Sequence, residues 1–258
     1  MQPCSFCNYG TLGKLRISGA DAGRFIATMT TANSERLALV GAAAPALLLT
    51  GEGEVIDVVM AIRTGDAEYM LTTSPSVAGE AFDWLLAHSK LCDGNGPVFP
   101  CLSITDETMS LAVAVLIGAG GRAVLDELVQ GTLAASTMES LSLVQLDTVP
   151  VMVLTYPFLK EEVFELYCAP GRWDAIEHVL LSFPEIDPIP LQHYLDARRA
   201  HGTWFAAAED GAYRYPDEAG LAHLIRPDAS YVGAAALQER THRDAPLPCS
   251  LPDSSTIP

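Results

Sequence analysis

The chain has 258 residues, of which 49% are hydrophobic and 18% are charged, enough apolar material for a sizeable core. Its 15 basic and 32 acidic residues give a formal net charge of −17. A surface this negative repels phosphate groups, so we expect neither a nucleic-acid partner nor an anionic membrane partner. A small anionic ligand in a locally basic pocket stays compatible with this charge.

The sequence shows no sign of export. The longest apolar runs, such as Leu111–Ile117, are too short to cross a bilayer. Met1–Gly10 has no basic stretch followed by an apolar one, as a signal peptide would have. We therefore expect a cytoplasmic location and no membrane association.

The first half of the chain alternates strand and helix patterns. Lys14–Ser18 alternates polar and apolar residues and predicts a strand, and Ala20–Thr30 predicts a helix with one apolar side. Glu54–Thr64 and Glu68–Thr73 predict two strands joined by a short turn. Ser76–Leu91 predicts an amphipathic helix.

The second half repeats this order. The predicted strand, helix, two strands and helix are Ser110–Ile117, Gly120–Gln130, Val149–Thr155, Val163–Cys168 and Gly171–Leu181. A unit used twice predicts an α+β fold of duplicated ferredoxin-like modules, each strand–helix–strand–strand–helix. The modules span about 12–91 and 109–183, within a core of residues 1–183.

The last quarter of the chain departs from this pattern. Residues 184–244 predict a segment that completes the core, with helices at Leu191–Gly202 and Gly233–Arg240. Residues 245–258 contain four prolines and offer little apolar surface, so burial cannot offset the entropy cost of ordering them. We predict a disordered tail there.

Two short motifs allow both a functional and a structural interpretation. Cys4 and Cys7 form a CxxC, but no second CxxC and no HxxxH follows, so we predict no metal site. Gly118–Ala123 fits the GxGxxA dinucleotide fingerprint, yet Glu139 lies before the next strand rather than at its end. A structural strand-to-helix turn is the alternative.

Acidic residues raise a similar question. The cluster Lys160–Glu162 predicts either a solvated hairpin tip or a carboxylate that accepts two hydrogen bonds from a heterocycle such as a pterin. Strand alternation puts Asp57 on the face of Val55, Val59 and Ala61, and a carboxylate there must be solvated at an edge, paired or functional. No nucleophile elbow is present and the six histidines are scattered, so we predict no hydrolase triad.

Several stretches together resemble the folate-binding aminomethyltransferases, that is, the glycine cleavage T-protein and its relatives. The matches follow the family's order over most of the chain, and this ordered series is more specific than any one of its members. They are Leu12–Ala22, Gly51–Ile62, Thr155–Tyr167, Leu195–Gly202, Pro216–Leu221 and Tyr231–Gly233.

The resemblance implies a tetrahydrofolate site in a central cavity and one-carbon transfer involving a small-molecule substrate. It implies cofactor binding by Glu161 and Arg198, which match family positions that hold the folate, with the neighbouring aromatic residues Phe158 and Trp204. A carboxylate beside the folate nitrogens supports such transfer in the family.

The active site differs from the family pattern. Val58 stands where the resemblance places the catalytic aspartate, and Asp57 would need a bulge to replace it, because adjacent strand residues point to opposite faces. The candidate catalytic residues are therefore Asp57, His201 and Tyr231, and we expect weak or absent aminomethyl transfer from the standard folate donor. We expect no C-terminal barrel domain. Ser230 replaces the cysteine of a related branch linked to iron–sulfur cluster assembly.

Three functional hypotheses follow. The first is a tetrahydrofolate-dependent transferase or demethylase acting on a small amine or ether. The second is an enzyme that keeps the fold but performs different chemistry, such as a cyclase or lyase. The third is a non-catalytic folate-binding or assembly subunit.

Overall fold

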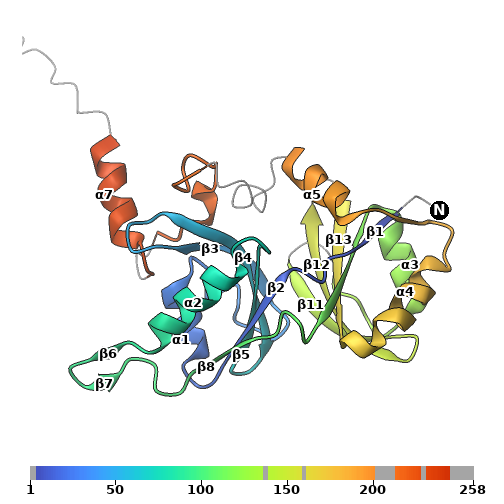
Figure 1. Ribbon diagram of the computed structural model, residues 1–258, viewed down its shortest axis with the longest axis horizontal. Coiled ribbons are helices and arrows are strands. Elements are labelled where there is room, and N and C mark those ends of the chain that lie inside the picture. Colours follow the sequence, from blue (N-terminus) through green and yellow to red (C-terminus); the bar gives the residue numbers. More distant parts are fainter. Residues whose placement is uncertain (1–3, 136–138, 159–160, 201–212, 228–230, 245–258) are drawn as a thin grey trace, which may run out of the picture.

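The computed structural model describes residues 4–135, 139–158, 161–200, 213–227 and 231–244. Two β-sheets stand side by side in the middle of the molecule, and helices lie outside them (Figure 1). Within these described ranges, no helix is long and apolar enough to span a membrane.

The first sheet has five strands in the order β3-β4-β5-β2-β8, and all neighbours are antiparallel. Its strands are β2 (Gly13–Ser18), β3 (Ala43–Leu49), β4 (Val55–Gly65), β5 (Glu68–Thr73) and β8 (Ser103–Asp106). Helices α1 (Ala22–Met29) and α2 (Ala78–Ser89) share one apolar cluster with it. A short hairpin, β6 (Cys92–Asp93) and β7 (Gly96–Pro97), follows α2.

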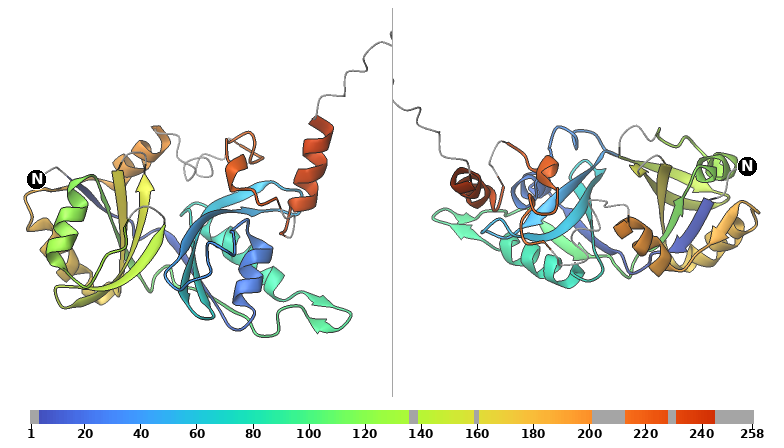
Figure 2. Two further views of the ribbon diagram at one scale, coloured as in Figure 1. Left: turned by 180° about the vertical axis from the view of Figure 1, so that it is seen from behind. Right: turned by 90° about the horizontal axis from the view of Figure 1, so that it is seen from above.

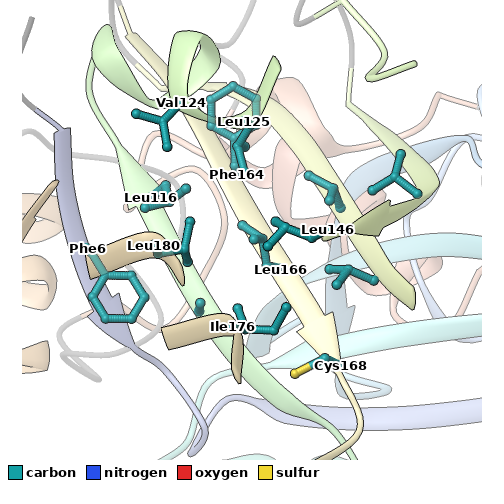
Figure 3. Packing of buried hydrophobic residues seen from close by; sticks show 14 of the residues in the cluster. Phe6, Leu116, Val124, Leu125, Leu146, Phe164, Leu166, Cys168, Ile176 and Leu180 are labelled. Carbon is teal, nitrogen blue, oxygen red and sulfur yellow. The ribbon is translucent and has the colours of Figure 1, made fainter. Parts of the chain in front are cut away.

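The second sheet has the order β10-β11-β12-β13-β9-β1-β14. Its strands are β1 (Cys4–Asn8), β9 (Ala112–Ile117), β10 (Val129–Gln130), β11 (Ser140–Leu146), β12 (Val149–Phe158), β13 (Glu161–Cys168) and β14 (Ile186–Pro188). Helices α3 (Gly120–Leu128) and α4 (Trp173–Leu181), with the short helix η1 (Pro170–Arg172), complete this half. Val124 of α3 and Ile176 of α4 point onto the strands beside Phe164 and Leu166 (Figure 3).

The strand orders of the two sheets correspond over four strands. Strands β3-β4-β5-β2 of the first sheet correspond to β11-β12-β13-β9 of the second, and a further strand, β8 or β1, follows in each. Between its two helices the first module has three strands, β3 to β5, and the second has four, β10 to β13, whereas the predicted ferredoxin-like unit has two. The prediction therefore lacked β3 in the first module and β10 and β11 in the second.

The predicted helices and hairpins are present with shifted ends. Helix α1 begins at Ala22 and α2 at Ala78, and each starts two residues later than predicted. The predicted hairpins are β4–β5 and β12–β13. Strand β1 was not predicted, although it lies between β9 and β14 inside the second sheet.

The C-terminal segment contacts both halves of the molecule. Strand β14 pairs with β1, and helix α5 (Leu191–Ala200) lies beside the second sheet. Helix α7 (Ala234–Asp244) lies beside β3, at the end of the molecule away from the second sheet (Figure 2). The short helix η2 (Ala222–Leu224) contacts β3. The predicted tail, 245–258, lies outside the described residues.

Candidate functional site

A third apolar cluster fills the space between the two sheets, and polar side chains are embedded in it. We call these side chains the polar layer. Its members are buried, with at most 3% of each residue exposed, and come from both sheets and α5. They are Tyr9, Lys14, Tyr156, Glu165, Tyr167, Tyr194 and Arg198.

Strand alternation explains why charged residues enter this space. In β2, Leu15 and Ile17 pack toward α1 and α2, so Lys14 lies on the opposite face, toward the second sheet. In β13, Phe164 and Leu166 pack toward α3 and α4, so Glu165 lies on the face toward the first sheet. The two modules thus contribute charges of opposite sign to one interface.

Glu165 is the centre of the polar layer's hydrogen bonds. The Tyr156 hydroxyl donates to one carboxylate oxygen over 2.9 Å, and the Tyr167 hydroxyl donates to the other. Burial raises the pKa of Glu165, and the two tyrosine hydrogen bonds and the charges of Arg198 and Lys14 oppose this rise. Because every one of these groups is shielded from water, each depends on the others for its polar contacts.

The two cations differ in their surroundings. The Lys14 ammonium donates to the Gly10 carbonyl over 3.0 Å, and burial lowers its pKa from 10.5 to about 8 against the opposing effects of Asp106 and Glu165. The Arg198 guanidinium lies 5.4 Å from the centroid of the Tyr194 ring and donates to the Tyr9 hydroxyl over 3.5 Å. A buried guanidinium between aromatic rings can hold a flat, polar ring system.

Of the predicted cofactor-binding residues, Arg198 is placed in the polar layer. Glu161 begins β13, opposite Phe158 of β12, but the side chains of both lie outside the described part of the structure. Trp204 and the candidate catalytic residue His201 fall outside the described residues.

Glu162 binds the Arg122 guanidinium through two hydrogen bonds of 2.7 and 3.1 Å. Lys14 and Glu165 were not predicted as site residues. A charged residue at an inward-facing position of an apolar strand is a sequence pattern that could have indicated them.

Asp57 supports the start of α2. Its carboxylate is fully buried and accepts hydrogen bonds from the Ser74 backbone N–H over 2.7 Å, the Ser74 hydroxyl over 2.8 Å and the Val58 N–H over 2.8 Å. Exposure at a sheet edge, one of the alternatives considered, is therefore wrong, because β4 lies between β3 and β5. The register shifts beside Asp57, as in a bulge, and this interrupts the simple alternation expected here.

Val58 and Tyr231 belong to a dry cluster. Val58 is 1% exposed and packs with Leu47 and Leu49 under Tyr231 and Leu221 of the C-terminal segment. We call this cluster, which also contains Ala234 and Leu237, the apolar cap. The position that the resemblance gives to a catalytic carboxylate is thus filled by apolar side chains.

The cysteine and glycine motifs have structural explanations. Cys4 packs toward α3 and α4, whereas Cys7 packs between the sheets, so the two thiols lie on opposite faces of β1 and cannot share a ligand. Within the described residues no group of metal-ligating side chains is found. Gly118 has a positive φ of 124°, and a side chain on Gly121 would come within 3.1 Å of the Cys4 Sγ atom. These glycines therefore let α3 lie close to the sheet.

A pocket of about 750 Å³ opens between the two modules. It is lined by part of the loop 33–43 from the first module and by Ala134, Ala135 and 139–141 from the second. We call it the inter-module pocket. Arg198, Asp57 and Tyr231 do not line it, so the predicted folate cavity at Arg198 stays a prediction.

The family profile described as the GCVT N-terminal domain matches residues 2–226. The chain belongs to this family. A member, an aminomethyltransferase of Bacillus cereus, is 24% identical over 91% of this chain and 63% of its own length. The chain thus spans less than two thirds of that GCVT relative.

A solved structure shows the same fold. The glycine cleavage system aminomethyltransferase T from Bartonella henselae superposes with a TM-score of 0.73, covering 94% of this chain and 64% of its own, at 16% identity. At this identity the likeness establishes the α+β fold of the GCVT family and not the activity. The resemblance drawn from the sequence motifs is therefore confirmed at the level of family.

Proposed function

We propose that this chain binds tetrahydrofolate and acts as a one-carbon transferase or demethylase on a small molecule. The observation that supports this most is the position of Arg198, which the family resemblance assigns to the folate site. It is buried against the rings of Tyr9 and Tyr194 in a layer that also contains a carboxylate. Aminomethyltransferase relatives support the class of chemistry.

The residue types proposed for the site would suit a pterin ring. A pterin presents an amino group, ring N–H groups and a carbonyl oxygen in one plane. A guanidinium donates to the carbonyl oxygen, a carboxylate such as Glu161 accepts from the amino group and the adjacent N–H, and tyrosine rings stack on the plane. When bound, tetrahydrofolate supplies the nitrogen atoms that carry the one-carbon unit. Arg198 and Glu161 would hold and orient it.

The apolar cap favours a second candidate, a folate-binding protein without transferase activity. A carboxylate at position 58 could stabilise a developing positive charge or relay a proton, and Val58 can do neither. Asp57 already accepts three hydrogen bonds, two from Ser74 in the β5–α2 turn and one from the Val58 N–H. Turnover of methylated amines, or its absence in a protein that binds folate, separates the two candidates.

Equilibrium binding of tetrahydrofolate tests both candidates. Glu161→Gln and Arg198→Lys are each expected to weaken binding by about 1.5–3 kcal/mol, since each disturbs charge-assisted hydrogen bonding. Arg172→Lys is the matched control, because Arg172 is exposed on η1, and it should bind like the wild type. Thermal melting shows whether each variant is folded. Failure of the folded wild type to bind tetrahydrofolate would refute the proposed function.

A further inference from the structure

We infer that the inter-module pocket is a second ligand site, for an organic cation with an apolar body, such as a primary amine on an aromatic or alicyclic group. Its volume of about 750 Å³ lies in the range of small-molecule sites, roughly 300–1,000 Å³. It does not include Arg198, so the inference does not rest on the proposed function.

Most of the pocket wall is apolar. Leu39 and Val40 are large side chains left 76% and 52% exposed beside it, and Leu141 and Ala135 face it from the second module. Exposing these side chains to water is unfavourable, so binding of an apolar body that covers them is favoured.

Hydrogen bonds within and between the modules hold the wall of the pocket. The Arg63 guanidinium donates to the carbonyls of Leu37 and Ala38 over 3.3 and 2.5 Å, and the Gly41 N–H donates to the Arg63 carbonyl. Across the modules, the Leu141 N–H donates to the Gly41 carbonyl over 2.6 Å. A wall held in this way does not have to be ordered when a ligand binds, which lowers the entropy cost of binding.

Charge decides the class of ligand. One basic residue, Arg36, and two acidic residues, Glu35 and Glu139, line the pocket. The Arg36 guanidinium is already paired with one oxygen of Glu139 over 2.6 Å, and the Glu139 side chain is only 12% exposed. The second Glu139 oxygen and the Glu35 carboxylate make no hydrogen bond to any described residue. The protein's net charge of −17 also attracts cations.

Calorimetric titration of the full chain, without folate, tests this inference. The probes are 4-phenylbutylamine and 1-adamantylamine, each with its matched alcohol and carboxylate. At least one amine should bind ten times more tightly than its alcohol and carboxylate. If neither amine binds, or if a carboxylate binds more tightly than its amine, the inference is wrong.

Three variants locate the site. Ala135→Trp fills the pocket from an exposed position and should weaken amine binding at least tenfold. Glu139→Gln should weaken it by a similar factor and, because it releases Arg36, should improve binding of the carboxylate. Glu127→Gln is the control, since Glu127 is exposed on α3 and does not line the pocket. Unchanged amine binding by folded Ala135→Trp would place the amine elsewhere and overturn the inference.

Discussion

The first sheet meets the rest of the chain at two buried junctions of opposite character. Toward the second sheet it presents Lys14, which lies in the polar layer with Glu165 and Arg198. Toward the C-terminal segment it presents Val58, covered by the apolar cap. The first junction retains charges that are costly to bury, whereas the cluster at the second is formed by apolar and aromatic side chains.

The difference shows where a ligand-recognising function fits best. The apolar cap is explained completely by burial of hydrophobic surface, and any similar set of side chains would serve. The polar layer is not explained in that way, because replacing buried charges by apolar residues is often neutral or stabilising. Charges retained in such a place are candidates for binding.

The largest effect is expected when the polar layer loses its only described carboxylate. Glu165→Leu removes the carboxylate that accepts from the hydroxyls of Tyr156 and Tyr167, and it removes a buried negative charge that opposes those of Lys14 and Arg198. We expect a loss of about 3–5 kcal/mol in the free energy of unfolding, measured with urea. Glu127→Leu, at an exposed position, is the control and should change it by less than about 0.5 kcal/mol. A loss for Glu165→Leu no larger than the control's would show that the layer is not coupled.

Lys14 gives the polar layer a pH dependence that the apolar cap lacks. Its pKa is about 8 in the folded protein against 10.5 for an ordinary lysine, so between these values the unfolded chain binds more protons. The Lys14 contribution to the free energy of unfolding therefore rises with pH across this window, by roughly 3 kcal/mol in all. Lys14→Met lacks this contribution.

The measurement is the difference in unfolding free energy between wild type and Lys14→Met, followed from pH 7 to pH 11. The tyrosines and Cys7 titrate in both proteins, so their effects largely cancel in the difference. The difference should be level below pH 8, rise between pH 8 and 10.5, and then level off. A difference that does not change with pH would mean that Lys14 reaches water.

A smaller effect is expected in the apolar cap. Val58→Thr keeps the shape of the side chain but puts a hydroxyl beside Leu47, Leu221 and Tyr231. We expect a loss of about 1–3 kcal/mol, since a hydroxyl in a dry cluster gives up its hydrogen bonds to water. Thermal melting measures it, and Val40→Thr, at an exposed position, is the isosteric control. Equal melting temperatures for the two variants would indicate that water enters the cap.

The sequence predicted the elements whose apolar residues repeat with a clear helix or strand period, and it predicted the other elements poorly. Helices α1 to α4 have an apolar side that repeats with the helical period, and the β4–β5 and β12–β13 hairpins alternate clearly. Strand β3 has the sequence Ala-Ala-Pro-Ala-Leu-Leu-Leu, and alanine and proline favour strands weakly. It is a strand because it pairs with β4 and packs against the C-terminal segment, and no local pattern shows these contacts.

The candidate site was predictable only in part. Family resemblance identified Arg198, and alternation alone shows that Lys14 and Glu165 lie on one face of their strands. That these faces meet depends on how the two sheets pack, which is a tertiary property. The role of Asp57 at the β5–α2 turn was likewise hidden, because its partner Ser74 is 17 residues away.

Strand β1 lies in the second sheet but precedes the first module in the chain. It is synthesised first, yet it pairs with β9 and β14, which emerge from the ribosome more than a hundred residues later. Until β9 emerges, Phe6 has no strand to pack beside, and without β1 one edge of β9 would be unpaired. The second module on its own, begun at residue 109, would expose that edge and be prone to aggregate. The order of synthesis thus opposes the order of assembly, and slow folding of the nascent chain follows from this connectivity.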